Sequence, residues 1–385
     1  MADTAPVFSA VSSNAHHLYT LLQCIGFAPK ATVQITPDGI RFAVEEGRVI
    51  QGLAFLDKAL FTTYSFNPPA GAANGNEDAA DNDDSSGTTY YPHFVISLSA
   101  LLETLKIFGI NDASASNSSK PPSAQQSRPM PSNAFTTPAL LLDRSCTLQY
   151  SQPGSPLSVT LSETGVKTTC ELTTYEPEDD ETDIPLQRDA IIMKIIMRSA
   201  WLHNAITELD STNPTVLKVS ASAKREPFFA LSGSGGPFSE SVVEFSVDQQ
   251  NQNNGSEGQS HHKIPADDGS SRPRAKGANK LAPTVTETFL VSPPSSMGSR
   301  IKQDYRFPLI RKASRAMAAA SKVSIRGDKQ GVLSLQFMID FEEGAGANPR
   351  PAGGAGEAGG SVAGSVAFVD FRFVPLLDEN ETEDG

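Results

Sequence analysis

The chain has 385 residues, of which 38% are hydrophobic, and it carries a net charge of −13 at pH 7. This length predicts two domains of ordinary size, and the charge argues against a nucleic-acid coat protein, because such domains are usually strongly basic. The N-terminal sequence MADTAPVFSAVSSN lacks the basic and apolar parts of a secretory signal, and no run approaches the ~20 apolar residues that cross a bilayer. We therefore expect a soluble intracellular protein with no membrane contact. Cys24, Cys146 and Cys170 are too few and too far apart for a disulfide framework or a zinc site, so we expect buried thiols.

The first half of the chain predicts strands and helices by its apolar spacing. In chain order it predicts strand 7–11, a helix from Asn14 to Ile25, strands 31–36, 40–45, 49–56, 60–66 and 91–98, a helix from Ser99 to Phe108, and strands 140–151, 156–162 and 166–175.

The second half repeats this order. It predicts strand 190–197, a helix from Ser199 to Leu209, strands 215–222, 227–233, 241–247, 285–291 and 304–308, a helix from Leu309 to Ala319, and strands 322–328, 331–339 and 365–374. A strand, a helix, several strands, a helix and several strands therefore occur twice, which indicates an internal duplication.

Four polar segments interrupt these elements at about 67–89, 111–137, 248–283 and 341–364. They contain few apolar residues and many turn formers, so we expect disordered surface insertions. His261 and His262 lie in the third insertion, where a solvated pair is a better interpretation than a metal site.

The run YEPEDDETDIP, residues 175–185, lies where the two halves join. Its carboxylates could form a metal cage, a catalytic cluster or a solvated strap. Pro177 and Pro185 prevent either flanking strand from continuing, and like charges keep a linker extended. A metal cage or a carboxylate active site needs groups that converge on rigid elements. We therefore interpret residues 174–188 as an acidic connector.

The positive charge is concentrated in one segment. Between 300 and 329, nine cations face only Asp304 and Asp328: Arg300, Lys302, Arg306, Arg311, Lys312, Arg315, Lys322, Arg326 and Lys329. Salt limits the reach of exposed charges to about 8 Å, so a nearby phosphate would be attracted to this segment despite the negative total charge.

Several stretches resemble the sliding clamps, and most closely the Rad-one family of subunits of the nine-one-one checkpoint ring. They are FSAVSSNAHHLYTLLQCIGF, TPDGIRFAVEEGRVIQGLAFL, FVISLSALLETLKIFG, YEPEDDETDIPL with MRSAWLHNAITELD, SKVSIRGDKQGVLSLQFMI and SVAFVDFRFVP. The resemblance implies an α+β sliding-clamp fold, with two similar domains that each pack two helices on antiparallel sheets. The domains would be residues 1–173 and 189–375, followed by an acidic tail at 376–385. The polar insertions suggest a filamentous fungus.

The resemblance also implies a function. The chain would be a non-catalytic subunit of a heterotrimeric ring in the nucleus, together with a Rad-nine-like and a Hus-one-like subunit. A clamp loader would place the ring on damaged DNA, where it would recruit and activate checkpoint signalling and repair factors. Double-stranded DNA would pass through the ring independently of sequence, and neither a cofactor nor a metal is expected.

A ring that slides on DNA needs helices with scattered cations and no base-reading side chains. The candidates for the DNA-facing surface are Lys106, Arg198, His203, Asn204, Arg311, Lys312 and Arg315. We expect the last three to share one side of the helix from Leu309 to Ala319. The helix from Asn14 to Ile25 has no Lys or Arg, so few cations would face DNA outside the helix from Leu309 to Ala319. This suits a subunit whose partners supply the remaining positive charge.

Ring closure in this family pairs exposed edge strands, and the resemblance places these edges at 166–175 and 240–247. The candidate interface residues are Val166, Thr168, Cys170, Leu172, Val243, Phe245 and Val247. By sequence alone, both segments fit internal strands equally well. The connector borders a groove for partner peptides in clamps, and Phe373, Val374 and Pro375 are candidates to line it. Because the connector is so acidic, we expect weak or altered binding of the usual clamp-interacting peptides.

Two alternatives remain open. A 3′–5′ DNA exonuclease would need acidic residues on rigid elements to hold two metal ions about 4 Å apart, and the nearest candidates, Glu208 and Asp210, lie at a helix end. A homotrimeric replicative clamp would differ from the checkpoint ring in self-association, which light scattering of the purified chain would detect.

Overall fold

The structure is a computed structural model that describes residues 5–67, 91–107, 145–163, 165–178, 183–237, 240–246, 286–341 and 365–377. Val247, His261 and His262 lie outside the described residues, as do nearly all positions of the four polar insertions. The acidic tail lies outside them except for its first two residues.

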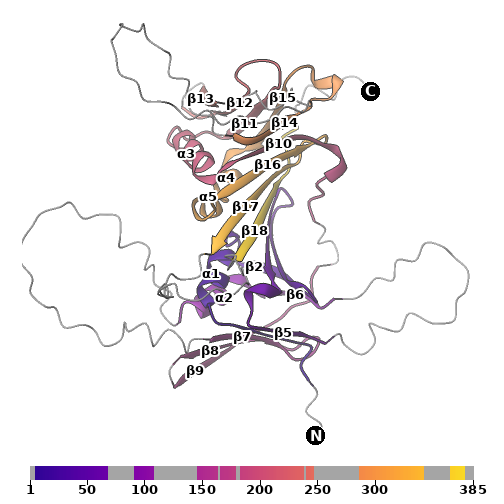
Figure 1. Cartoon of the computed structure of the whole chain (residues 1–385), viewed down its shortest axis with the longest axis vertical. Helices are drawn as coiled ribbons and strands as arrows, with labels where there is room; N and C mark the ends of the chain where they lie inside the picture. The colour runs from indigo at the N-terminus through magenta and orange to yellow at the C-terminus, as the bar shows by residue number, and fades with distance from the viewer. Residues whose placement is uncertain are drawn as a thin grey trace, which may run out of the picture.

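The first half contains two helices and nine strands among its described residues (Figure 1). They are β1 (Phe8–Ser12), α1 (Ala15–Cys24), β2 (Lys30–Thr36), β3 (Gly39–Glu46), β4 (Ile50–Asp57), β5 (Thr63–Phe66), β6 (His93–Ser97), α2 (Leu98–Leu105), β7 (Ser145–Tyr150), β8 (Leu157–Glu163) and β9 (Val166–Leu172). The helix α1 begins where the sequence predicts, because the Asn14 side chain accepts a hydrogen bond from the His16 N–H and caps the helix.

The second half repeats this order after the connector. Its elements are β10 (Ile191–Arg198), α3 (Ser199–Asp210), β11 (Val216–Ala221), β12 (Phe229–Ser234), β13 (Glu240–Phe245), β14 (Thr286–Val291), β15 (Ile301–Arg306), α4 (Phe307–Arg311), α5 (Ser314–Ala319), β16 (Lys322–Asp328), β17 (Leu333–Phe341) and β18 (Ser365–Phe373). Short 3-10 turns lie at Lys58–Leu60, Arg188–Ala190 and Ser295–Met297.

The predicted helix from Leu309 to Ala319 is wrong as a single element, because it is divided into α4 and α5. The Ser314 hydroxyl donates a hydrogen bond of 2.5 Å to the Arg311 carbonyl, which competes with the regular helical pattern at that point. Lys312 and Ala313 lie between the two short helices, so Arg311, Lys312 and Arg315 do not share one side of a single continuous helix.

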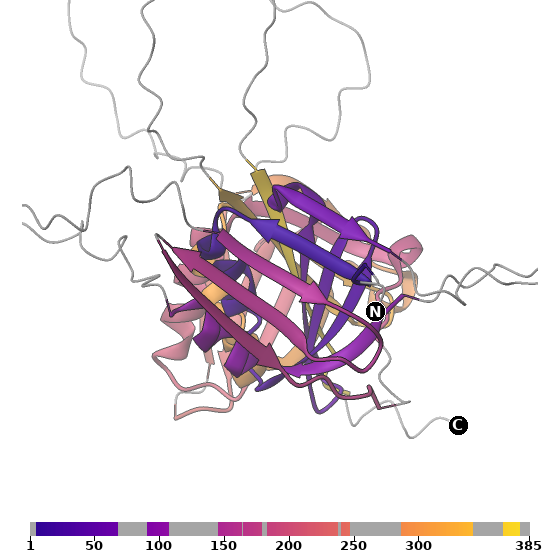
Figure 2. The ribbon, with the colours of Figure 1, turned by 90° about the horizontal axis from the view of Figure 1, so that it is seen from below.

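The described strands form three antiparallel sheets. One sheet has the order β5-β1-β7-β8-β9, a second has β14-β10-β16-β17-β18-β4-β3-β2-β6, and the third has β13-β12-β11-β15. Figure 1 shows the nine-stranded sheet running through both halves, and Figure 2 shows the five-stranded sheet as the layer that closes the lower end. The last strand in the chain, β18, joins the halves because it pairs with β4, from Val369 opposite Ala54 to Phe373 opposite Ile50.

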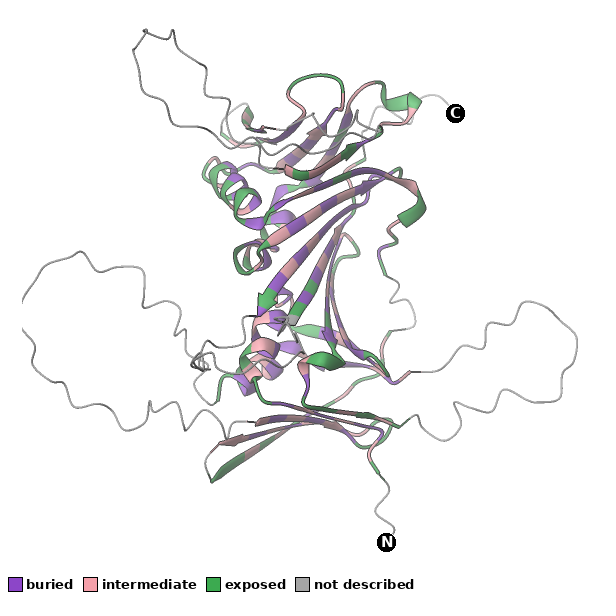
Figure 3. Ribbon diagram, viewed as in Figure 1, coloured by how far each residue is buried: buried purple, intermediate pink, exposed green. Residues whose placement is uncertain are grey.

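Buried residues alternate with less buried ones along most strands (Figure 3). The buried apolar residues of the strands form one core cluster with those of the helices. Phe371 and Phe373 of β18 are at most 1% exposed, and Phe371 lies 6.0 Å from both Phe27 and Phe337, measured between ring centroids. A single hydrophobic core therefore continues through both halves.

Candidate nucleic-acid face and subunit edges

The helices of both halves lie on the same side of the nine-stranded sheet (Figure 1). They contact one another in the order α2, α1, α5, α3, so one continuous helical surface crosses from the first half to the second. All seven residues predicted to face DNA belong to these helices or to their flanking residues.

Lys106 is exposed at the C-terminal end of α2. Its ammonium donates a hydrogen bond of 2.9 Å to Glu103, which raises the pKa of Lys106, and it lies 5.8 Å above the ring of Tyr19. Because Glu103 is next to it on the same surface, the net charge that Lys106 offers to a phosphate is small.

The α3 candidates differ in exposure. Arg198 is the exposed N-cap residue, and Asn204 is exposed on the side of the helix opposite the buried Leu202 and Ile206. His203 is only half-buried, and it lies on the side of α3 that also carries Asp210. This helix offers DNA one cation at its start and polar side chains beyond it.

Arg311 and Lys312 each form an ion pair within the chain. Arg311 donates to Asp210 of α3 at 3.1 Å, with 57% of the Arg311 side chain exposed. Lys312 pairs with Glu46 of β3, and its ammonium lies 5.6 Å from the ring centroid of Phe27. The Lys312 side chain is only 26% exposed, and its two partners belong to the other half of the chain. The sequence does not predict this contact, because no local pattern links positions 266 residues apart.

Arg315 is exposed on α5, and it has no ion-pair partner among the described residues. It lies close enough to α1 to influence Cys24, whose pKa burial raises to about 12, while the positive charge of Arg315 acts in the opposite direction. Of the three cations predicted on this segment, Arg315 is therefore the one whose charge is available to an external anion.

The two strands predicted as subunit edges are edge strands in the structure. β9 ends the five-stranded sheet, and β13 ends the four-stranded sheet. On β9, Val166 is 58% exposed, Thr168 and Cys170 are half-buried, and Leu172 is buried. On β13, Val243 is half-buried and Phe245 is buried, whereas Val242 faces outward with 52% of its surface exposed.

The duplication gives these two edges a specific relationship. By chain order within each half, β9 corresponds to β18 and β13 corresponds to β4. β18 and β4 pair with each other inside the chain, whereas β9 and β13 each leave one side without a partner strand among the described residues. A second clamp-like chain could therefore continue the sheet by the same antiparallel pairing that joins the two halves here.

The predicted peptide groove needs a correction. Phe373 is 1% exposed and points into the core, so its ring cannot line a surface groove. The alternation of a strand that faces the core with every second side chain puts Phe373 on the inner face together with Phe371. Val374 is 36% exposed, and its N–H donates to the Val49 carbonyl. Pro375 lies at a hollow of about 780 Å³ beside β11, β12 and β15. Because both residues are at least partly accessible, Val374 and Pro375 remain predicted lining residues of a peptide groove.

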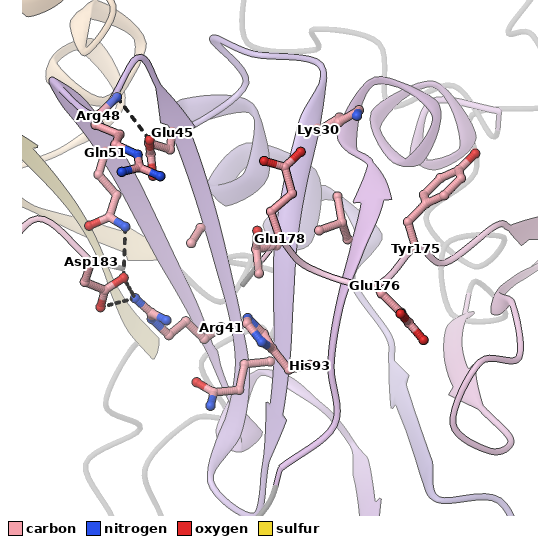
Figure 4. A pocket seen from close by; sticks show the side chains of 14 residues that line it. Lys30, Arg41, Glu45, Arg48, Gln51, His93, Tyr175, Glu176, Glu178 and Asp183 are labelled. Atoms are coloured by element: carbon pink, nitrogen blue, oxygen red, sulfur yellow. Dashed lines mark hydrogen bonds and ion pairs between the residues drawn. The ribbon is translucent and has the colours of Figure 1, made fainter. Parts of the chain in front are cut away.

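The described connector residues Tyr175, Glu176, Glu178 and Asp183 line a cleft of about 620 Å³ on the outer face of the first half (Figure 4). Figure 4 shows Arg41 and Gln51 directed at the Asp183 carboxylate, to which they donate hydrogen bonds of 2.6 and 2.9 Å. The next residue, Ile184, is buried; its N–H donates to Gln51, and its carbonyl accepts from Arg372 at 2.7 Å. The connector is thus fixed to the sheet at this end.

Asp183 is ionised at neutral pH, because its pKa lies below the ordinary value of 3.8. Burial by itself would raise its pKa, but the hydrogen bond and charge of Arg41, the hydrogen bond from Gln51 and the charge of Arg372 together lower it. Tyr175 forms an antiparallel bridge with Val95 and anchors the other end of the connector. The described connector residues therefore form a strap that is attached to the sheet at both ends.

Within the described residues, no group of three or more His, Cys, Asp and Glu side chains could hold a metal ion. The Asp210 carboxylate is already paired with Arg311, and Glu208 is exposed on α3. The helices in the described ranges are also too short or too polar to cross a membrane.

Comparison with known proteins agrees with this geometry. Residues 7–339 match the family model described as "Repair protein Rad1/Rec1/Rad17". The chain is 30% identical to the "DNA damage checkpoint control protein rad1" of Schizosaccharomyces pombe, over 98% of this chain and 89% of that protein. It is 29% identical to the human "Cell cycle checkpoint protein RAD1", over 88% of both chains.

A more distant relative is the "DNA repair exonuclease REC1" of Mycosarcoma maydis, at 27% identity over 60% of this chain and 47% of that protein. Among solved structures, the chain is similar to PCNA from Thermococcus kodakaraensis, with a TM-score of 0.53 and 14% identity, over 96% of this chain and all of the other. The predicted sliding-clamp fold is therefore confirmed, and the chain belongs to the Rad1/Rec1/Rad17 family of repair proteins.

Proposed function

We propose that this chain is a non-catalytic subunit of a heterotrimeric DNA clamp that acts in the DNA damage checkpoint. The observation that carries the proposal is the relationship between the edges. The chain joins its own two halves by pairing β18 with β4, and within the part of the chain that the structure describes the corresponding strands β9 and β13 each keep one free edge, at opposite ends. Repetition of the same pairing by further clamp subunits would close a ring.

DNA would pass along the continuous helical surface. Arg198 and Arg315 supply cations there, while Lys106, Arg311 and Lys312 are each paired with a carboxylate. Sparse positive charge suits sequence-independent contact with phosphates at a distance. It also suits a ring whose other two subunits, a Rad-nine-like and a Hus-one-like chain, contribute more of the charge. A clamp loader and a nuclear location belong to the same proposal.

Recruitment of signalling and repair factors would use the outer surface, because the inner one is occupied by DNA. Val374 and Pro375 are the remaining candidates for the peptide groove, and Pro375 lies at the hollow beside β11, β12 and β15 rather than at the cleft beside the connector. Because the connector is so acidic, the usual clamp-interacting peptides would bind weakly or in an altered way.

A nuclease activity has one argument in its favour, the name of the Mycosarcoma maydis relative. The ion pair between Asp210 and Arg311 argues against a metal site at the end of α3. Nuclease activity that co-elutes with the purified chain, and that is lost in both the Glu208→Gln and Asp210→Asn variants, would contradict the non-catalytic assignment.

The deciding experiment measures the mass of the purified chain by light scattering, alone and mixed with the two candidate partner subunits. We expect a monomer alone and one copy of each subunit in the mixture. A stable trimer of this chain would instead support the homotrimeric replicative clamp. Failure to bind either partner would contradict both ring assignments.

A further inference from the structure

The face of the nine-stranded sheet opposite the helices carries an unusual row of cations. Lys194 of β10 lies directly opposite Arg326 of β16, Arg326 lies opposite Ser334 of β17, and Ser334 lies opposite Arg372 of β18. Their strand neighbours Ile195, Ile325 and Phe371 are buried in the core, so the row lies on the outer face of the sheet. Ser334 is itself covered there, and its hydroxyl donates to Asp370. Like charges directly opposite each other in a sheet are destabilising, which makes the pair of Lys194 and Arg326 a cost to the fold.

The chain compensates this charge only in part. Arg372 donates to Asp370 at 3.2 Å and to the Ile184 carbonyl, and Lys322 pairs with Glu287 at 2.8 Å. Neither Lys194 nor Arg326 has a hydrogen bond or an ion pair from its side chain to any described residue, and the Arg326 Nε atom is buried without a partner. Burial lowers the pKa of Arg326, the charges of Arg188 and Arg372 lower it further, and only Asp370 opposes them.

An apolar surface lies beside the cations on the same face. Phe368 is 48% exposed, and it lies directly opposite the half-buried Met338. Val366 and Phe55, which flank Phe368 on β18 and β4, are 44% and 36% exposed. A hollow of about 330 Å³ brings both features together, because it is lined by Lys194, Lys322 and Arg326 and also by Ile196, Met338 and Phe368.

We propose that this outer surface, defined by Lys194, Arg326, Met338 and Phe368, docks an acidic segment of a partner protein that carries one aromatic or large aliphatic side chain. The carboxylates would neutralise Lys194 and Arg326, whose side chains pair with none of the described residues. The apolar side chain would enter the hollow and cover Phe368. A purely apolar ligand would desolvate the cations without pairing them, which is unfavourable.

The charge balance of the hollow supports this choice of partner. Its lining has three cations and one acid, Glu287, on a chain whose net charge is −13. Nucleic acid would also match the cations, but its phosphates would leave the apolar half of the surface uncovered. The surface lies on the opposite side of the sheet from the helices, so it would stay accessible while DNA occupies the helical surface.

The test uses the full chain and fluorescein-labelled peptides in a fluorescence anisotropy titration. The probe is the acidic aromatic peptide EDFEDE, and the matched probes are EDSEDE, which lacks the aromatic side chain, and QNFQNQ, which lacks the charge. We expect EDFEDE to bind at least about tenfold more tightly than either matched peptide, and its affinity to fall as salt is raised. Equal binding of the three peptides, or no binding of EDFEDE at about 1 mM, would overturn the proposal.

Two variants locate the site. Lys194→Glu and Phe368→Ser change exposed side chains, and each should weaken EDFEDE binding at least about tenfold. Lys224→Glu makes the same charge change on an exposed residue between β11 and β12, away from the hollow, and should leave binding unchanged. Thermal unfolding of each variant checks that it is folded, and unchanged binding in both site variants would refute the location.

Two further results would identify a different occupant. If EDFEDE binds only after Asp179, Asp180 and Glu181 are replaced by Asn, Asn and Gln, the connector of this chain covers the surface instead of a partner. If a labelled duplex DNA binds to the chain and Lys194→Glu weakens it more than it weakens the peptide, the surface is a nucleic-acid site. Neither result depends on ring assembly, so the proposal and the clamp function can fail separately.

Discussion

Lys312, at the end of α4, forms an ion pair with Glu46 at the end of β3, and so connects the second half of the chain to the first. The same ammonium lies 5.6 Å from the ring centroid of Phe27. The contact sits next to the packing of α5 on α1, where the continuous helical surface passes between the halves. A cation that the sequence assigns to DNA therefore also stabilises the junction between the two halves.

Replacing Lys312 with Ala should lower the free energy of unfolding by about 0.5–1.5 kcal/mol, because a partly exposed ion pair and a cation–π contact are both lost. Replacing the exposed Arg315 with Ala should change it by less than about 0.5 kcal/mol. Urea unfolding of the two variants measures both values. Equal stability of the two variants would mean that the contact of Lys312 with Glu46 contributes nothing to the junction.

The strands and helices could be predicted from the sequence because their signals are local. Asn14 caps α1, and alternating apolar residues mark β2, β3 and β9. At the break between α4 and α5, the N–H groups of Lys312 and Ala313 donate to the carbonyls three residues before them, and the Ser314 hydroxyl donates to the Arg311 carbonyl. The apolar pattern indicates none of these bonds. The burial of Phe373 could have been predicted from the alternation along β18, because Phe371 and Phe373 lie on an apolar face, whereas the other face carries Asp370 and Arg372.

The site was less predictable because its contacts are long-range. Glu46 and Lys312 are 266 positions apart, and the pairing of β18 with β4 joins the last strand of the chain to its fourth. The edge position of β9 and β13 could not be derived from their composition, which fits internal strands equally well. Only the resemblance to clamps placed them at edges, and the three-sheet topology agrees with that placement.

The attachment of the connector should depend on pH through Asp183. Its pKa lies below the ordinary value of 3.8, so the unfolded chain binds a proton at a higher pH than the folded chain. The contribution of Asp183 to stability is therefore fully present above the ordinary pKa and is lost as pH falls through the lowered one. Asp183→Asn should lower stability by less than about 1 kcal/mol at neutral pH, since the pair is half-exposed, and this difference should shrink below about pH 4.

Hydrogen exchange at the Ile184 amide gives a local measure of the same change, because that N–H donates to Gln51 next to Asp183. Exchange should be faster in Asp183→Asn at neutral pH. The matched control is Asp38→Asn, which breaks the exposed pair of Asp38 with Lys58 at 2.9 Å and does not involve the connector. Unaltered Ile184 exchange in Asp183→Asn would contradict the assigned role of Asp183.

The two edge strands should serve different partners. Val166→Asp puts a charge on β9 and Val242→Asp puts one on β13, at residues that are 58% and 52% exposed in the isolated chain. A charge on a pairing edge blocks strand addition, while an exposed substitution leaves the fold nearly unchanged. Each variant should lose one clamp subunit, with affinity lowered at least about tenfold, and keep the other.

Light scattering of pairwise mixtures measures this loss of partners. Leu377→Asp is a suitable control, because Leu377 is 90% exposed and lies on neither edge. If both edge variants lost the same partner, or neither lost any, β9 and β13 would not be the two interfaces of the ring.

Arg315 should contribute more to the affinity for DNA than Arg311 or Lys312 does. In the assembled ring, Arg315→Ala should weaken loading to a similar degree on DNA of unrelated sequences. The slope of log affinity against log salt should become shallower by about one unit, because one phosphate contact is lost. The Lys224→Ala variant, which changes an exposed residue between β11 and β12, should leave this slope unchanged.

In the triple variant with Ala at 311, 312 and 315, the salt slope should become shallower by clearly less than three units, since Asp210 and Glu46 already neutralise two of the cations. A full loss of about three units would mean that Arg311 and Lys312 leave their carboxylates when DNA is bound. A normal slope for Arg315→Ala in an intact ring would show that Arg315 contacts no phosphate, and that Arg198 or the partner subunits supply the cations that do.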